Sequence, residues 1–571
     1  MQHAILTSVI LWAGRIAFLA FSLVYALSAQ TSAAPPPLVS ILGNELDRNF
    51  AILSKKSDPV AYYIAYSVAD EESGSIVAIL GGITSDGRTQ RRIGECTLRV
   101  GTADFDNFHV VDGERPSFTS SAPLPVQDDP AAIGLAFWRL TDAAQRGAVQ
   151  RFQQVQTTVK NKQAPARASA DFSLEPAKIA IESVPNIKLN AEEWKARLRK
   201  ISLLFKDAPV AIASTVSLSW RRELKTLVNS EGTREYHGRT FATLSIVARG
   251  KAQDGEDLVA LESFDAEDPA RLPKDDALVV AVRKAIATLE KLRSAPQPDP
   301  FVGPAILSGR AAGVFFHEIF GHRIEGHRQT DLQEGQTFSN SVGKSVLPEF
   351  LTVISDPTLH STAGSDLNGW YDFDDEGVAA RRVTLVENGI LKTFLLSRTP
   401  APGFARSNGH GRKQPGYEAV SRQSNLLVQP AKTVTEAELR RLLLVEAKRQ
   451  GKDYGLYFDV VTGGFTQTRR ESLQSFTVIP LVVYRVYVDG RPDEMVRGVD
   501  IVGTPLSSFA RIIAAGDKPG VFNGYCGAES GQVPVSAVSP ALLISEIEIQ
   551  RKRNSGDRPP LLDRPIEGGI Q

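Results

Sequence analysis

Cysteine is nearly absent from this chain, which has only Cys96 and Cys526 among 571 residues. A disulfide framework therefore does not hold the fold together. Two interpretations stay open on the residues alone. Either the two thiols pair and close a very long loop, or Cys526 is a metal-bound thiolate and Cys96 is a buried, small apolar side chain.

The chain also lacks an excess of charge of either sign, because Lys plus Arg (65) equal Asp plus Glu (65). This balance gives no reason to expect nucleic acid or an anionic membrane as a partner, and we expect neither. Apolar residues make up 42 % and charged residues 23 %, which argues against bulk disorder and against a multi-span membrane protein. The length predicts about two to four domains.

Apolar runs of membrane-spanning length are missing beyond the N-terminal end. There, Arg15 precedes an apolar run that stops at Ala26 and is too short to cross a bilayer, and a small-x-small pattern ends at Ser28. We expect residues 1–28 to be a signal peptide that is cleaved near Ala29. The mature protein would then be exported, periplasmic or extracellular, and free of the membrane. An uncleaved membrane anchor is the alternative interpretation.

Three prolines within five residues mark a boundary near residue 300, because they disfavour a continuous helix or a central strand there. We expect an N-terminal region at 38–300, a C-terminal domain at 301–552 and a polar tail at 553–571. Helical stretches and antiparallel strand patterns occur on both sides of the boundary.

Short turn and cap signals locate several elements. The Asp-Gly pair at 86–87 and the Asn-Gly pair at 388–389 each predict a hairpin turn between apolar runs. Thr435 with Glu438 forms a capping-box pattern and predicts that a helix begins there.

The stretch GVFFHEIFGHRIEGHR, residues 313–328, carries three of the eight histidines. His317 and His322 lie five positions apart, and Glu318 follows the first. On a regular α-helix this spacing turns two side chains about 140° apart, so they cannot face one metal ion. A π-bulge would bring them together, and so would an early helix end at Gly321 that lets the second histidine turn back.

A catalytic zinc ion usually takes three protein ligands and keeps one position for water. Cys526 is a candidate for the third ligand, because its glycine-rich loop can bring the sulfur close to a distant helix. His327, Glu325 and the carboxylates of 372–376 are further candidates. In the purely structural interpretation, His317 is a core histidine and the other histidines lie in a solvated turn.

Two other patterns receive no catalytic role. The chain has no GxSxG motif, which argues against a conventional serine hydrolase. The basic stretch Trp220-Arg221-Arg222 indicates a solvated face with one anchored aromatic ring.

Several separated segments resemble the TldD/PmbA family of metallopeptidases. They are NSEG (229–232), HEIFGH (317–322), DDEG (374–377), LVENGILK (385–392), SRQSNLLV (421–428) and NGYCG (523–527). The resemblance is close from about 300 to 550, and the HExxxH motif with a late cysteine is its most specific part. It implies that His317, His322 and Cys526 bind Zn²⁺ and that Glu318 is the catalytic residue. PmbA-type chains lack these ligands, so the TldD type is the better match.

The resemblance also implies a fold of class α+β. An N-terminal α/β region would be followed by a C-terminal domain dominated by antiparallel β-sheet that carries the HExxxH helix. Subunits would pair as a homodimer, or as a heterodimer with a PmbA-like subunit, around a cavity in which short or unfolded peptides are cut. The expected function is therefore an exported zinc metallopeptidase with Glu318 as general base. The alternative is a non-catalytic peptide-binding or assembly subunit of the same fold.

Overall fold

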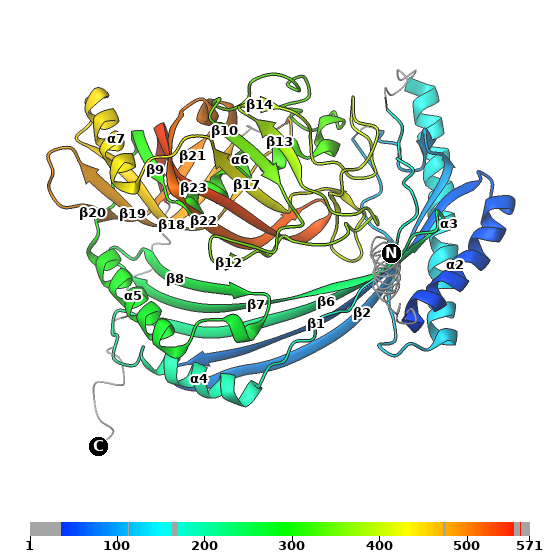
Figure 1. The fold of residues 1–571 in the computed structure, drawn as a ribbon, viewed down its shortest axis with the longest axis horizontal. Helices are drawn as coiled ribbons and strands as arrows, with labels where there is room; N and C mark the ends of the chain where they lie inside the picture. The colour runs from blue at the N-terminus through cyan, green and yellow to red at the C-terminus, as the bar shows by residue number, and fades with distance from the viewer. Residues whose placement is uncertain (1–35, 112, 163–168, 472–474, 553–559, 561–571) are drawn as a thin grey trace, which may run out of the picture.

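The structure is a computed structural model that describes residues 36–552 and 560, apart from residues 112, 163–168 and 472–474 (Figure 1). The expected signal peptide lies outside the described residues, and so does the expected polar tail except for Pro560. Among the described residues, no helix combines the length and the apolar character that crossing a membrane requires. Two large β-sheets dominate the molecule, and the long strands of the first run beneath the second (Figure 1).

The first sheet has eight strands in the described part of the chain and is antiparallel except where β5 pairs with β7. The strand order is β3-β2-β1-β6-β7-β5, with β4 beside β2 and β8 beside β7. The strands are β1 (Ala61–Ile79), β2 (Gly82–Thr102), β3 (Phe105–Asp106), β4 (Ser120–Pro123), β5 (Ile179–Ile181), β6 (Ala213–Asn229), β7 (Arg234–Lys251) and β8 (Asp257–Ala266).

Helices cover both ends of this sheet (Figure 1). They are α2 (Pro37–Lys56), α3 (Pro130–Lys162), α4 (Ala191–Leu203) and α5 (Asp275–Ser294), with a 3-10 turn η1 (Pro269–Arg271). Leu38, Leu42 and Leu46 recur every four residues on α2, so one face of this helix is buried against α3 and the sheet. At the other end, Leu198 of α4 and Val282 of α5 are fully buried in a second core.

The second sheet has eleven strands in the described residues, in the order β14-β13-β10-β17-β23-β21-β19-β18-β9, with β20 beside β19 and β22 beside β23. The strands are β9 (Phe301–Leu307), β10 (Leu351–Ser355), β13 (Val383–Glu387), β14 (Ile390–Leu391), β17 (Asn425–Pro430), β18 (Tyr454–Thr466), β19 (Phe476–Tyr487), β20 (Glu494–Val496), β21 (Val499–Gly503), β22 (Ile512–Ala528) and β23 (Gly531–Arg551). The other elements are the two-stranded pairs β11 (Ser361–Thr362) with β12 (Ser365–Asp366) and β15 (Gly411–Arg412) with β16 (Val420–Ser421), and the helices α7 (Glu436–Arg449) and α8 (Pro505–Phe509).

An additional pairing between β23 and β9 closes the path β23-β21-β19-β18-β9 on itself. Helix α6 (Gly309–Ile319) packs against β23, β18 and β22, and its side chains belong to the largest apolar core. The helix is apolar almost all round, which is typical of a helix buried on every side. The HExxxH motif therefore sits inside the second sheet.

Of the two predicted hairpins, one is confirmed and one is wrong. The pair at 388–389 joins β13 to β14, with φ of 49° at Asn388 and 80° at Gly389. The pair at 86–87 lies inside β2 and pairs with β1. The turn between β1 and β2 is instead at Leu80 and Gly81, whose φ values are 48° and 86°. Both turns need positive φ at two positions, as tight hairpins do.

The expected α+β class is confirmed, and both sheets are mainly antiparallel, with parallel pairs at β5–β7, β17–β23 and β18–β9. The division into domains at residue 300 stays a prediction, because buried polar contacts join the two sheets. Arg398, which is 1 % exposed, donates to Ser173 O at 2.7 Å and to Glu231 Oε1 at 2.6 Å. Arg239 donates to Asn368 O at 2.6 Å.

Candidate metal centre

The local fold of the HExxxH segment answers the question that its spacing raises. Helix α6 begins at Gly309 and ends at Ile319, and the hydroxyl oxygen of its N-cap residue Ser308 accepts a hydrogen bond from Ala311 N–H at 3.2 Å. The 3-10 turn η2 (Gly321–Ile324) follows. The early helix end is therefore the alternative that the structure adopts. A Cβ at Gly321 would overlap the side chain of Gln423, so glycine is needed at this point.

Three side chains from different elements meet beyond the end of α6. The potential ligand atoms of His317, His322 and Cys526 all lie within 4.8 Å of one another, and all three residues are buried. The Cys526 Sγ is 3.4 Å from His322 Nε2, and the two imidazole centroids are 5.1 Å apart. Among the described residues, no other group of three or more His, Cys, Asp or Glu side chains meets in this way.

Neighbouring groups fix the orientation of these side chains. Glu325 Oε2 lies 3.5 Å from His322 Nδ1, which leaves Nε2 facing the sulfur. The Cys526 carbonyl accepts a hydrogen bond from Arg422 at 2.6 Å. A carboxylate behind a histidine ring is the usual support of a metal-binding imidazole.

Both cysteines are free thiols, so the disulfide interpretation does not hold. Burial raises the pKa of Cys96 to about 12, as expected for a small side chain in an apolar core. Burial alone would also raise the pKa of Cys526, but the two histidines and Arg422 lower it well below its usual value. Burial would lower the pKa of His322, but Cys526 and Glu325 raise it well above its usual value.

These two shifts favour a thiolate beside a protonated imidazole. A divalent metal ion would take the place of that proton, since metal ligands must be deprotonated. Two imidazole nitrogens with one thiolate form a donor set that suits zinc. The residues present therefore fit a zinc ion.

Glu318 lies beside these donors and is 6 % exposed. Burial raises the pKa of its carboxyl group, while the two neighbouring histidines act in the opposite direction. Gly464 of β18 approaches it so closely that a Cβ there would lie 2.8 Å from Glu318 Cγ. The carboxyl group is thus held between α6 and β18.

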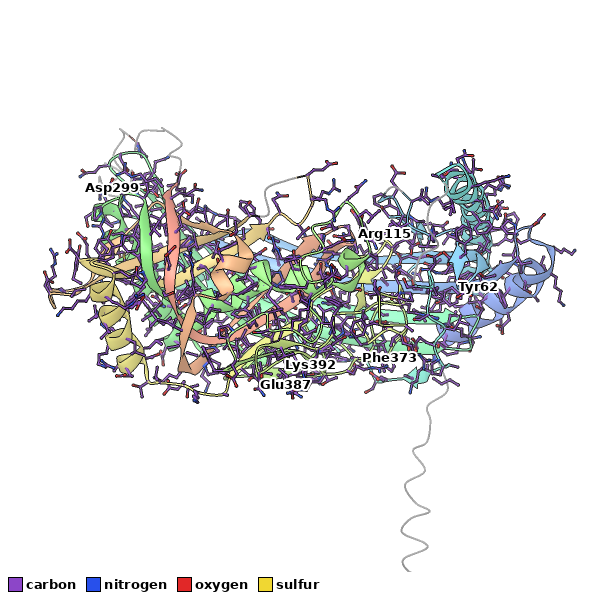
Figure 2. The ribbon with its side chains drawn as sticks, turned by 90° about the horizontal axis from the view of Figure 1, so that it is seen from above. Tyr62, Arg115, Asp299, Phe373, Glu387 and Lys392 are labelled. Atoms are coloured by element: carbon purple, nitrogen blue, oxygen red, sulfur yellow. The ribbon has the colours of Figure 1, made fainter. Side chains whose placement is uncertain are left out.

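The donors and Glu318 line a cleft of about 900 Å³. Its walls come from 113–117 in the first sheet's β3–β4 connection and from 464–469 and 525–529 in the second sheet. Arg115, labelled in Figure 2, is 3.6 Å from Glu529 across this cleft. Residues that belong to both sheets therefore enclose the site.

The other candidate ligands have partners elsewhere. His327 Nε2 contacts Glu529, and Glu325 pairs with Arg328 at 2.8 Å. Within 372–376, Asp375 contacts Lys225 of the first sheet. These groups support the site or join the sheets, and none of them completes the donor group.

Sequence reasoning assigned no role to Arg422, Gln423 or Gly464. Gln423 donates to His317 O at 3.3 Å, next to the contact of Arg422 with Cys526. The only signal for the first two was that both lie in SRQSNLLV, one of the segments that carried the family resemblance.

Known proteins match this chain in both sequence and fold. The family model described as the PmbA/TldA metallopeptidase C-terminal domain matches residues 302–551. A metalloprotease of Methanocaldococcus jannaschii is 30% identical over 263 residues, which are 46% of this chain and 53% of that protein. A zinc metalloprotease TldD homolog of Saccharolobus solfataricus is 26% identical over 278 residues, 48% of this chain and 57% of its own length. The chain thus spans about half the length of the curated relatives it matches.

The similarity of fold extends further along the chain. The crystal structure of TldE from Thermococcus kodakarensis superposes with a TM-score of 0.57 at 14% identity, covering 88% of this chain and 99% of that one. At this identity the match establishes the fold alone. The sequence matches show that residues 302–551 carry a C-terminal metallopeptidase domain of the PmbA/TldA type, and the fold match to TldE extends over most of the chain.

Proposed function

We propose that this chain is a zinc-dependent metallopeptidase that hydrolyses peptide bonds in short or unfolded peptides. The observation that carries the proposal is the meeting of His317, His322 and Cys526 within 4.8 Å, beside a buried glutamate in an open cleft. The similarity to proteins named metalloproteases supports the reaction class.

In this proposal His317, His322 and Cys526 would hold the zinc ion. Zinc bound there supplies Lewis acidity, which polarises a peptide carbonyl and acidifies a water molecule. The three ligands come from α6, η2 and β22, so the site depends on the packing of the second sheet around the helix.

Glu318 acts as the general base. Its carboxylate accepts a proton from the attacking water, and the resulting carboxylic acid donates that proton to the leaving amine. Burial raises the pKa of this group, which makes its protonated form accessible nearer to neutral pH for the second transfer. Its position between α6 and Gly464 holds it at the edge of the cleft.

The first experiment measures zinc content by elemental analysis in the wild type, Cys526→Ser and Cys96→Ala. We expect about one zinc per chain in the wild type and in the Cys96 control, whose thiol is buried in the apolar core of the first sheet. The Cys526 variant should lose most of its zinc, because a hydroxyl replaces the thiolate. Unchanged zinc in that variant would contradict the ligand assignment.

The second experiment compares Glu318→Gln with Glu387→Gln, a control on the β13–β14 hairpin, where Glu387 is paired with Lys392 (Figure 2). Glu318→Gln should keep its zinc and lose about 10²- to 10⁴-fold in peptide cleavage, while the control keeps both. Retained cleavage would remove Glu318 as the base. If the folded wild type neither binds zinc nor cleaves peptides, the interpretation as a non-catalytic peptide-binding subunit would replace the peptidase proposal.

The proposal includes export and paired subunits. Export rests on the sequence of residues 1–28, and pairing as a homodimer or with a PmbA-like subunit rests on the similarity to TldD- and TldE-named proteins. Cell fractionation and light scattering of the purified protein test these two points. A full-length protein in the cytoplasm would contradict export, and a monomer both alone and with a PmbA-like protein would contradict pairing.

A further inference from the structure

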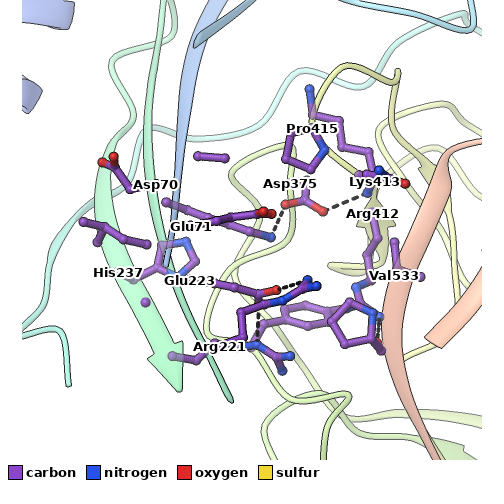
Figure 3. Close-up of a pocket in the computed structure, with 18 of the residues that line it drawn as sticks. Asp70, Glu71, Arg221, Glu223, His237, Asp375, Arg412, Lys413, Pro415 and Val533 are labelled. Atoms are coloured by element: carbon purple, nitrogen blue, oxygen red, sulfur yellow. Dashed lines mark hydrogen bonds and ion pairs between the residues drawn. The ribbon is translucent and has the colours of Figure 1, made fainter. Parts of the chain in front are cut away.

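A second cavity, of about 380 Å³, lies between the first sheet and the second, next to the metal cleft (Figure 3). Strands β1, β2, β6 and β7 form one wall, and the segments 370–375, 412–415 and 532–534 form the other. Tyr525, the residue before Cys526, lines both this cavity and the metal cleft. The cavity and the metal cleft therefore adjoin each other at Tyr525.

One wall of this cavity carries a buried guanidinium group without a carboxylate partner. Arg412 is 4 % exposed, and its Nη1 donates to the carbonyl oxygens of Gln423 at 2.6 Å and Pro534 at 2.7 Å. The nearby Asp375 instead contacts Lys225 and accepts from Lys413 N at 2.8 Å. The Arg412 guanidinium also lies 4.7 Å from the centroid of the Tyr371 ring, but it forms no ion pair with a carboxylate among the described residues.

Across the cavity, two more guanidinium groups share a single carboxylate (Figure 3). Arg221 Nη1 is 3.1 Å from Glu223 Oε1, and Arg239 Nε donates to Glu223 Oε2 at 2.7 Å. Burial would raise the pKa of Glu223, but Arg239 and Arg221 lower it to about 2. This carboxylate is thus ionised and pairs with both guanidinium groups. Its single negative charge neutralises only one of their two positive charges.

The other charged groups of the lining leave this excess small. Most of them are paired: Lys225 with Asp375, Arg91 with Glu71, Asp70 with Arg92, and Lys413 with Glu95. The remaining acid, Asp372, lies against Glu182, and burial together with Asp372 raises the pKa of Glu182. Asp372 offsets one of the two unmatched guanidinium charges. The cavity therefore keeps about one positive charge, which suits a monoanion such as a carboxylate rather than a polyanion.

The rest of the lining combines apolar and aromatic side chains with the polar His237, Gln414 and Gln532. Leu224, Val533 and Tyr371 lie beside the arginines, and so does Trp370, which is 7 % exposed. An apolar side chain next to a carboxylate would match this mixture.

We propose that this cavity binds a carboxylate of the peptide whose scissile bond lies in the metal cleft, and that Arg221 and Arg412 recognise it. The carboxylate is the C-terminal one or that of an Asp or Glu side chain, since both offer the same chemistry. This inference rests on the proposed peptidase function and names a feature of its substrates. Arg221, which the sequence placed on a solvated face, becomes a specificity-determining residue.

The test measures binding by calorimetry on zinc-loaded Glu318→Gln protein, so that cleavage does not interfere. Three short unstructured peptides are compared: one ending in Leu with a free carboxylate, its C-terminal amide, and the amide with Glu as the penultimate residue. We expect the free acid to bind about tenfold or more tightly than the plain amide, because a charged hydrogen bond is lost. If a side chain supplies the carboxylate, the Glu-containing amide regains that affinity.

Arg221→Gln tests the site, and Arg222→Gln is its matched control. The two are neighbours on β6 and point to opposite faces, and Arg222 Nε donates to Pro185 O outside the cavity. Arg221→Gln leaves the pair of Glu223 with Arg239 in place, so the sheet should fold, as circular dichroism would check. We expect Arg221→Gln to reduce the preference for a carboxylate to about twofold or less and Arg222→Gln to keep it.

Equal binding of all three peptides, no binding of any, or an undiminished preference in Arg221→Gln would overturn the proposal. Cleavage by the wild type is scored separately with the same peptides. A carboxylate preference in binding without cleavage or zinc would overturn the proposed function and leave the cavity assignment standing. Cleavage without a carboxylate preference would overturn the cavity assignment and leave the proposed function standing.

Discussion

Glu235 on β7 is a buried acid whose ionisation the fold resists. It is 1 % exposed, and neither carboxyl oxygen has a hydrogen-bond partner among the described residues. Burial raises its pKa to about 9, Asp374 and Glu182 add to this, and Lys178 acts in the opposite direction. At neutral pH this carboxyl group therefore keeps its proton in the folded protein and loses it on unfolding.

The stability that follows from this shift has a definite sign. The pKa is raised in the folded state, so the contribution of Glu235 is fully present below the ordinary value of 4.5 and is lost as the pH rises towards about 9. The loss is about 1.4 kcal/mol per pH unit in this window, or about 3 kcal/mol at pH 7 relative to a neutral side chain of the same shape. Glu235→Gln removes the ionisation and should remove this slope.

The assay is urea unfolding of the wild type and Glu235→Gln at about pH 5.5, 7 and 8. The difference in free energy of unfolding, variant minus wild type, should increase by about 1.4 kcal/mol for each unit of rising pH. Any constant cost of fitting the amide cancels in this comparison, so the variant serves as its own control. A difference in stability that stays the same from pH 5.5 to pH 8 would refute the reasoning.

Two further substitutions probe the site and a helix start. Gly464→Ala places a Cβ 2.8 Å from Glu318 Cγ and 2.7 Å from Thr477 O. We therefore expect kcat to fall about 10²-fold while zinc content is unchanged, and an unchanged kcat would show that Glu318 is not confined there. Thr435→Ala removes the hydroxyl that accepts a hydrogen bond from Glu438 N–H at 3.2 Å. The free energy of unfolding in urea should fall by about 1 kcal/mol, and an unchanged value would mean that the cap contributes nothing.

Local signals predicted the fold where local geometry decides it. The Asn-Gly pair at 388–389 forms its turn because the flanking strands end there, and both residues tolerate positive φ. The Asp-Gly pair at 86–87 has the same preference, but the pairing of β1 with β2 continues past it to Leu80 and Gly81. Register over a long hairpin depends on every cross-strand pair, and a two-residue signal does not report it.

At the site, too, local sequence patterns predicted what depends on neighbouring residues and missed what depends on contacts with distant ones. The spacing of His317 and His322 limited the backbone to two alternatives, and the early helix end is one of them. Cys526 lies 204 residues from His322, so no spacing rule connects them, and only the resemblance to a family did so. Arg221 was assigned to solvent because its own strand gives no sign of the second sheet that covers it.

The charge network explains how such distant ligands stay in place without a disulfide. Glu325 is fully buried, yet its pKa is lowered to about 2, since His322 and Arg328 outweigh the effect of burial. It therefore stays ionised, 3.5 Å from His322 on one side and 3.5 Å from Arg422 on the other. Arg422 in turn holds the backbone of Cys526. Arg328, 2.8 Å from Glu325, supplies a third positive partner, so the buried carboxylate stays compensated while it links the segments that carry His322 and Cys526.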